Sequence, residues 1–84
     1  MYTQYKTPKQ LATLKARSRI LSEAHRKGYV TNEKAKRIGN WEQAWYHLSQ
    51  MAEAGLLKQA GYNRWICAKP GKRWYKQARK VLEN

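Results

Sequence analysis

The chain has 84 residues, of which 18 are Lys or Arg and only 5 are acidic, so its formal net charge at pH 7 is +13. This length predicts one small domain with a modest core. No stretch is apolar for long enough to cross a membrane or to act as a secretion signal. The single cysteine excludes an internal disulfide, and a soluble cytoplasmic protein is expected.

The first predicted element is a helix over residues 8–27. Thr7 is a suitable N-cap, Pro8 fits the first helical position, and Gln10 stands at capping-box distance from Thr7. Gly28 ends the helix. The stripe expected to face inward comprises Leu11, Leu14, Ser18, Leu21 and His25, with Ile20 and Ala24 on one flank. Residues 1–6 lack periodicity and are expected to form a flexible N-terminal arm.

Two short helices joined by a tight turn are predicted over residues 31–50. Thr31 caps the first of them. Gly39 is expected to adopt the left-handed conformation that ends it, because glycine has no Cβ to clash there. Asn40 is then expected to cap the second helix, with Gln43 completing a capping box.

The second helix of this pair is predicted over residues 41–54. Its inward stripe is Ala44, Leu48, Met51 and Ala52. Trp41 and Trp45 lie along the edge of that stripe, and both are assigned to the core in preference to the margin of a ligand-binding surface. No Lys or Arg occurs between Trp41 and Leu57, whereas basic residues are frequent on both sides.

Two β-prone runs, 56–60 and 64–68, flank Gly61-Tyr62-Asn63. Glycine at the first turn position favours a type II′ hairpin, which would place Leu57 opposite Ile66 and Leu56 opposite Cys67. Pro70 and Gly71 then break the chain. A final basic helix follows over residues 72–84, with one face formed by Trp74, Ala78, Val81 and Leu82.

The spacing of residues in the helix pair resembles the helix-turn-helix of bacterial and phage repressors. The matching residues are the small Ala35, the turn residue Gly39, and the apolar Ile38, Trp45 and Leu48. Lys34 and Asn40 depart from the pattern, since apolar residues are usual at those positions. The following hairpin and closing helix are similar to the winged subclass, which includes the multiple-antibiotic-resistance and arsenic-resistance repressors. The resemblance covers residues 9–82. It implies a single mainly α domain with a small β-hairpin: three helices, a wing and a C-terminal helix.

The resemblance also implies a set of DNA-contacting residues. Residues 41–54 would form the recognition helix in the major groove, where the side chains expected to read base edges are Trp41, Glu42, Gln43, Tyr46, His47 and Gln50. Residues 56–68 would form the wing. The residues expected to contact the DNA backbone or minor groove are Thr31, Lys34, Lys36, Arg37, Asn40, Lys58, Tyr62, Asn63 and Arg64. Each of these residues has the alternative interpretation of an ordinary solvated side chain.

The expected function is sequence-preferring binding of double-stranded DNA by a small, nucleoid-associated transcriptional regulator of phage or mobile-element type, with a homodimer possible. An RNA-binding or ribosome-binding basic protein is one alternative. A protein-interaction module that targets a host polymerase or nuclease is another. No enzyme activity, cofactor, metal, membrane partner or small-molecule effector is expected, because the chain has no Asp, and His25, His47 and Cys67 lack metal-ligand spacing.

Overall fold

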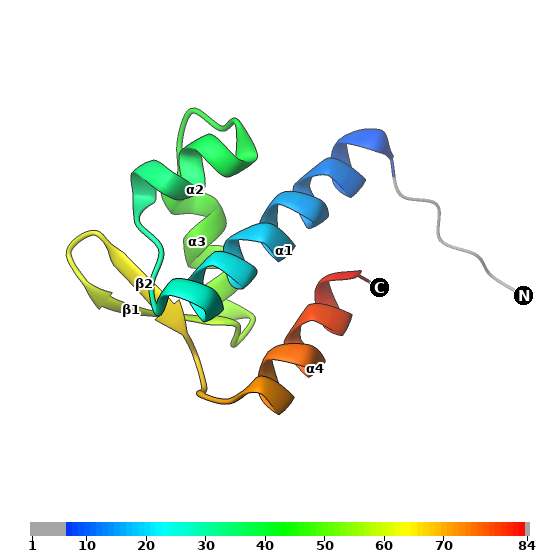
Figure 1. Cartoon of the computed structure of the whole chain (residues 1–84). Coiled ribbons are helices and arrows are strands. Elements are labelled where there is room, and N and C mark those ends of the chain that lie inside the picture. Colours follow the sequence, from blue (N-terminus) through cyan, green and yellow to red (C-terminus); the bar gives the residue numbers. More distant parts are fainter. Residues whose placement is uncertain (1–6, 84) are drawn as a thin grey trace, which may run out of the picture.

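The computed structural model describes residues 7–83, which form a mainly helical structure with one small two-stranded hairpin (Figure 1). The elements are α1 (Pro8–Lys27), α2 (Asn32–Gly39), α3 (Ala44–Glu53), β1 (Leu57–Gly61), β2 (Arg64–Cys67) and α4 (Lys72–Glu83). The predicted class, mainly α with a small β-hairpin, is therefore confirmed. The predicted arm over residues 1–6 lies outside the described residues, as does Asn84.

Helix α1 is the longest element, and α4 lies beside it although the two come from opposite ends of the chain (Figure 1). The Thr7 hydroxyl and the Gln10 side chain form the predicted capping box, and Gly28 ends the helix with a φ of 90°. The buried face of α1 is Ala16, Ile20, Leu21, Glu23 and Ala24. The predicted stripe is partly wrong, because Leu11 and His25 are exposed. The first turns of α1 extend past α2 and α3 (Figure 1).

The core lies where α1, α2, α3 and the hairpin meet. Its largest fully buried side chains are Ile20, Leu21, Val30, Leu48 and Met51. Burying each such side chain contributes about 1.5–3 kcal/mol relative to leaving it in water. The predicted inward residues of α3 are confirmed, because Ala44, Leu48 and Met51 are buried and Ala52 packs against the core.

The hairpin forms where expected, but its predicted register and turn type are wrong. Leu57 pairs with Cys67, not with Ile66, and Leu56 lies before the strand. The register shifts between Gln59 and Gly61, where a bulge takes up one residue. Neither Gly61 nor the two turn residues after it have a positive φ, which a type II′ turn requires. The hairpin is also joined to the link between α1 and α2, where Val30 and Trp65 exchange two backbone hydrogen bonds of 2.8 and 2.9 Å.

Helix α4 packs on α1 through one face. Ala78 and Leu82 are buried, and Trp74 and Tyr75 pack against the core. The Tyr75 ring stacks on His25 of α1 with 4.1 Å between ring centroids. Val81 was predicted to face inward and is instead exposed, because the buried face follows the 75, 78 and 82 spacing. No helix in residues 7–83 is long and apolar enough to span a membrane.

Candidate nucleic-acid interface

The bend between α2 and α3 differs in detail from the prediction. Gly39 is the last residue of α2 and has no positive φ; the left-handed residue is Asn40, at φ 53° and ψ 45°. Asparagine is the residue that tolerates this conformation best after glycine. Asn40 is thus the C-cap of α2 and not the N-cap of α3. Gln43 occupies that N-cap position without a side-chain hydrogen bond, and α3 begins at Ala44, three residues later than predicted.

Gly39 is required for a different reason, which is its contact with Trp41. A Cβ atom at residue 39 would lie 2.3 Å from the Trp41 indole, a distance that real structures do not allow. Trp41 is partly buried against the core, and its ring stacks on His47 with centroids 3.6 Å apart. Trp41 therefore supports the bend, and its ring face is already occupied.

Arg17 of α1 holds the middle of α3 and was not identified from the sequence. Its guanidinium donates to Nδ1 of His47 at 3.1 Å and to Oε1 of Gln50 at 3.5 Å. The Nε atom of Arg17 is buried and has no hydrogen-bond partner among the described residues. The available signal was the spacing of Arg17 between Leu14 and Leu21, which puts it on the inner face of α1.

The surroundings of His47 favour its neutral, unprotonated form. Burial, and then the neighbouring Arg17 charge, lower the pKa of His47 below its ordinary value. Its Nδ1 accepts the Arg17 hydrogen bond, which a protonated Nδ1 could not do. His47 and Gln50 were both predicted to read bases, and in this structure one polar atom of each, His47 Nδ1 and Gln50 Oε1, joins α3 to α1.

The tip of the hairpin is fixed to the start of α2. The Asn63 side chain accepts from the backbone N–H of Asn32 at 2.9 Å and donates to the carboxylate of Glu33. This bond from Asn63 is the main cause that lowers the pKa of Glu33. Below it, the Trp65 indole donates to the Asn32 side chain at 2.8 Å. Asn63 was predicted to reach DNA from the wing, and in this structure both its amide oxygen and its amide nitrogen form hydrogen bonds within the protein.

Thr31 is also used inside the protein. Its hydroxyl accepts from the Lys34 backbone N–H at 3.1 Å and caps α2, as predicted. A second contact from this hydroxyl to a phosphate is possible only through its own proton, since the oxygen already serves as the cap.

Three aromatic side chains on α3 and the hairpin are exposed. Trp45 is 59% exposed, Tyr46 56% and Tyr62 89%. The assignment of Trp45 to the core is therefore wrong, because more than half of its side chain is in contact with solvent. Trp45 and Tyr62 line an open hollow of about 470 Å³ together with residues of α2 and the hairpin, which are Asn32, Glu33, Gln59 and Asn63. Glu42 and Gln43, just before α3, are exposed as well.

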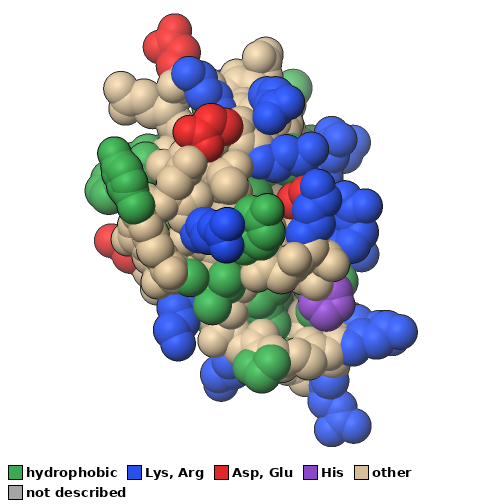
Figure 2. Space-filling model, turned by 60° about the vertical axis from the view of Figure 1, so that its left-hand side comes forward, with side chains coloured by type: hydrophobic (Ala, Val, Ile, Leu, Met, Phe, Trp, Pro, Cys, Tyr) green, Lys and Arg blue, Asp and Glu red, His purple; other side chains and the backbone are tan. Residues whose placement is uncertain are grey.

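Basic side chains frame this surface but do not enter it. Lys36 and Arg37 are exposed on α2, and Lys34 is half-buried there. Lys58 and Arg64 are exposed on the hairpin, where the Arg64 guanidinium lies 4.5 Å from the centre of the Tyr29 ring. In Figure 2 the Lys and Arg side chains are densest along the right-hand side, while the left-hand side carries hydrophobic and neutral groups together with acidic side chains and fewer cations. The arrangement can hold a polyanion at its edges and leave between them an aromatic surface whose hollow is lined by Glu33 and by no Lys or Arg of the described residues.

Comparisons with known proteins provide no relative for this chain: no family model, no curated protein and no solved structure matches it. Within residues 7–83, no group of three or more His, Cys, Asp or Glu side chains is placed to hold a metal ion.

Proposed function

We propose that the protein is a winged helix-turn-helix protein that binds duplex DNA with a sequence preference and acts as a small transcriptional regulator. In this proposal α3 enters the major groove and the hairpin is the wing. The observation that supports it best is the Asn63 connection, which fixes the hairpin tip to α2 beside the exposed side of α3. A wing contributes to recognition only when its position relative to the recognition helix is fixed.

We assign DNA contacts to the side chains of this surface that are exposed to solvent. Glu42, Gln43 and Tyr46 have exposed side chains at or near the start of α3, which is the part of a recognition helix that meets base edges. Gln43 suits adenine, and Glu42 can accept a hydrogen bond from cytosine. Phosphates would be held by the exposed cations on α2 and the hairpin, which are Lys36, Arg37, Lys58 and Arg64. Trp41, His47 and Gln50 would act as supports for α3.

The test begins by selecting bound sequences from a pool of random duplexes. Replacing Gln43 with Ala is then expected to weaken binding to the selected site by about tenfold, and to change binding to random DNA by less than about twofold, because one bidentate base contact contributes roughly 1–3 kcal/mol. Gln77→Ala is the matched control, since Gln77 is exposed on α4 away from the proposed interface. Equal losses on both DNAs would exclude base reading by Gln43.

A protein partner at the same surface is the second candidate function. It is favoured by the exposure of Trp45 and Tyr46 on a helix that has no Lys or Arg. Exposed aromatic residues of this kind are frequent centres of protein–protein contacts. A Trp45→Ala variant that keeps its DNA affinity but no longer retains a polymerase or nuclease from nuclease-treated lysate would favour this candidate over the first.

A further inference from the structure

An open groove of about 430 Å³ lies between the first half of α1 and the end of α4. Its floor is largely apolar and includes Leu11, Leu14 and Leu82. Leu82 belongs to the core, Leu14 packs against it, and Leu11 remains 49% exposed. None of the described residues that line the groove belongs to the proposed DNA interface, so the two surfaces can be occupied together.

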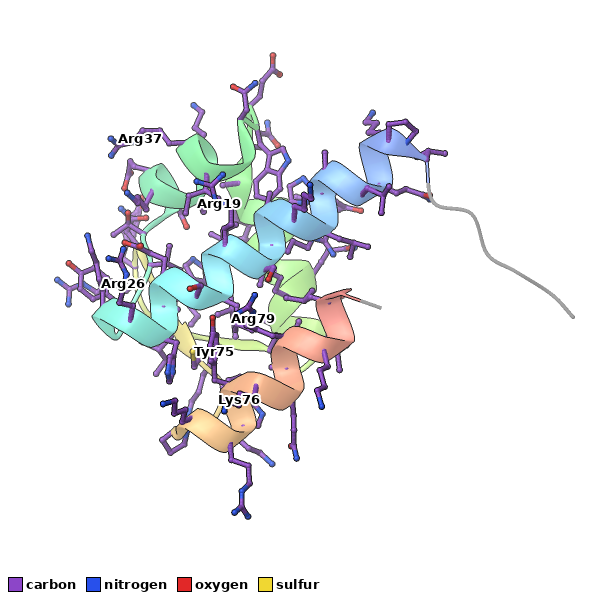
Figure 3. All side chains as sticks on the ribbon, turned by 45° about the vertical axis from the view of Figure 1, so that its right-hand side comes forward. Arg19, Arg26, Arg37, Tyr75, Lys76 and Arg79 are labelled. Atoms are coloured by element: carbon purple, nitrogen blue, oxygen red, sulfur yellow. The ribbon has the colours of Figure 1, made fainter. Side chains whose placement is uncertain are left out.

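The rim of the groove is positively charged. Lys15 and Arg19 line it from α1 and Arg79 lines it from α4, and none of the lining residues that the structure describes is acidic. Figure 3 shows Arg79 and Lys76 on α4. Arg19 and Arg26 on α1 and Arg37 on α2 lie farther toward the α2 side of the molecule. Arg19 also lines a second hollow, between α1 and α2, together with Arg26 and Lys34. The Glu23 carboxylate in that hollow is paired with Arg26 at 2.7 Å and with Lys27 at 3.2 Å.

We propose that the groove between α1 and α4 binds an acidic amphipathic helix of a partner protein. Apolar side chains on one stripe of that helix would cover Leu11 and Leu14, and its Asp or Glu residues would face Lys15, Arg19 and Arg79. Burial of the leucines supplies affinity, and the charges select the partner and its orientation.

The chemistry of the groove favours this occupant over two others. A nucleic-acid backbone has no apolar surface to bury against leucines, so it would leave the floor of the groove in contact with phosphates. A second copy of this chain has a formal charge of +13 and would bring like charges together at the rim, which opposes association.

The proposal is tested with a fluorescein-labelled synthetic peptide of about 16 residues, in which Leu recurs at helical spacing and Glu fills most other positions. Its binding to the full chain is measured by fluorescence anisotropy. A second peptide has the same composition but no Leu stripe. The protein variants are Leu11→Ala and Arg19→Glu, with Lys15→Glu as a second rim variant. Arg73→Glu is the control, since it makes the same charge change at an exposed residue of α4 that does not line the groove.

The striped peptide is expected to bind at least about tenfold more tightly than the unstriped one. Leu11→Ala and each rim variant should weaken it by about fivefold to tenfold, and Arg73→Glu by less than about twofold. Thermal melts establish that the variants are folded. These outcomes do not depend on DNA binding. The proposed DNA-binding function can therefore fail while peptide binding in the groove holds, and peptide binding can fail while the DNA-binding function holds.

Three results would overturn the proposal. Equal binding of both peptides, with Arg73→Glu as harmful as Arg19→Glu, would show attraction by net charge alone. Loss of duplex DNA binding in Leu11→Ala, with DNA displacing the peptide, would make nucleic acid the occupant. Sedimentation as a dimer that Leu11→Ala converts to a monomer would make a second copy the occupant.

Discussion

At the level of single residues, the bend between α2 and α3 depends on the packing of the Trp41 ring against Gly39. The glycine provides a surface without a Cβ, and the indole covers it and stacks in turn on His47. The left-handed conformation belongs to the next residue, Asn40. The bend is therefore held by ring packing as well as by its backbone hydrogen bonds.

Replacing Gly39 with Ala is expected to destabilise the protein by about 1–3 kcal/mol, because the new methyl group overlaps the Trp41 ring and the ring must move. Urea unfolding measures the change. Gly61→Ala is the matched control, since its Cβ meets nothing within 4 Å and Gly61 has no positive φ. If the indole is the cause, Trp41→Ala should remove most of the additional cost of Gly39→Ala in the double variant; a cost that persists would place the cause in the backbone.

The contact between Arg17 and His47 predicts a dependence of stability on pH. Because the pKa of His47 is lower in the folded protein than in the unfolded chain, the unfolded chain takes up the proton more readily. The stability from this contact is complete above about pH 6.5, the ordinary pKa of histidine, and is lost as the pH falls toward the folded-state value. Urea midpoints measured from pH 7.5 down to pH 5 should show this loss.

The His47→Gln variant provides the control for this prediction. Its side chain can still accept the hydrogen bond from Arg17 but does not titrate. The part of the pH dependence that belongs to His47 should disappear in this variant. An unchanged decline between pH 7 and pH 5 would assign the effect to other groups.

At the level of elements, the hairpin is attached to the rest of the protein at two places. Val30 pairs with Trp65 near its base, and Asn63 binds Asn32 and Glu33 at its tip. A two-stranded hairpin alone is marginally stable in water. These attachments, together with the burial of Leu57 and Trp65, explain why it holds one position beside α3.

Asn63→Ala should release the tip of the hairpin while its base stays in place. Loss of the bond from the Asn32 N–H is expected to cost about 0.5–1.5 kcal/mol. Hydrogen exchange of the Asn32 amide should become faster, whereas the amides of Val30 and Trp65 should keep their protection. Tyr62→Ala, at an exposed neighbouring residue of the turn, should leave all three unchanged. If all three amides lose protection in Asn63→Ala, the tip and base form one cooperative unit.

The elements that the sequence predicted well are those with local signals. Thr7, Pro8, Gln10 and Gly28 define both ends of α1 because each acts within four residues of itself. The 3.6-residue period likewise identified Ala44, Leu48 and Met51 as the buried residues of α3.

The errors arise where distant or competing contacts decide. The start of α3 was placed too early, because the stacking of Trp41 on Gly39 and His47 keeps residues 41–43 out of the helix. The bond between Arg17 and His47 joins residues 30 apart, and helical periodicity alone does not specify such a pair. The hairpin register was wrong because it depends on a bulge, and no residue type in this stretch predicts that bulge.

At the level of the whole molecule, the positive charge is unevenly distributed. Helix α1 carries six Lys or Arg residues and α4 carries five, whereas α3 carries none. Arg17 of α1 bonds directly to α3, and further cations lie on the two elements that pack against α3, which are α2 and the hairpin. Most of the others lie on α1 and α4, and three of these, Lys15, Arg19 and Arg79, line the apolar groove.

This distribution predicts the salt dependence of DNA binding. Lys58→Gln and Arg37→Gln should each lower affinity for all duplexes to a similar extent, and each should reduce the slope of log affinity against log salt by about 1. The slopes are measured by anisotropy at several salt concentrations. Arg73→Gln on α4 should leave the slope nearly unchanged. A reduction as large in Arg73→Gln as in Lys58→Gln would move the DNA to the α4 side.

The packing of α4 on α1 also has a consequence for synthesis of the protein. The ribosome makes α1 before α4, so the groove floor and the stacked pair His25 and Tyr75 cannot form while α4 is still in the exit tunnel. Until then Leu14 and the neighbouring side of α1 face water or a chaperone. The nascent chain therefore reaches its final structure only after translation of α4 is complete.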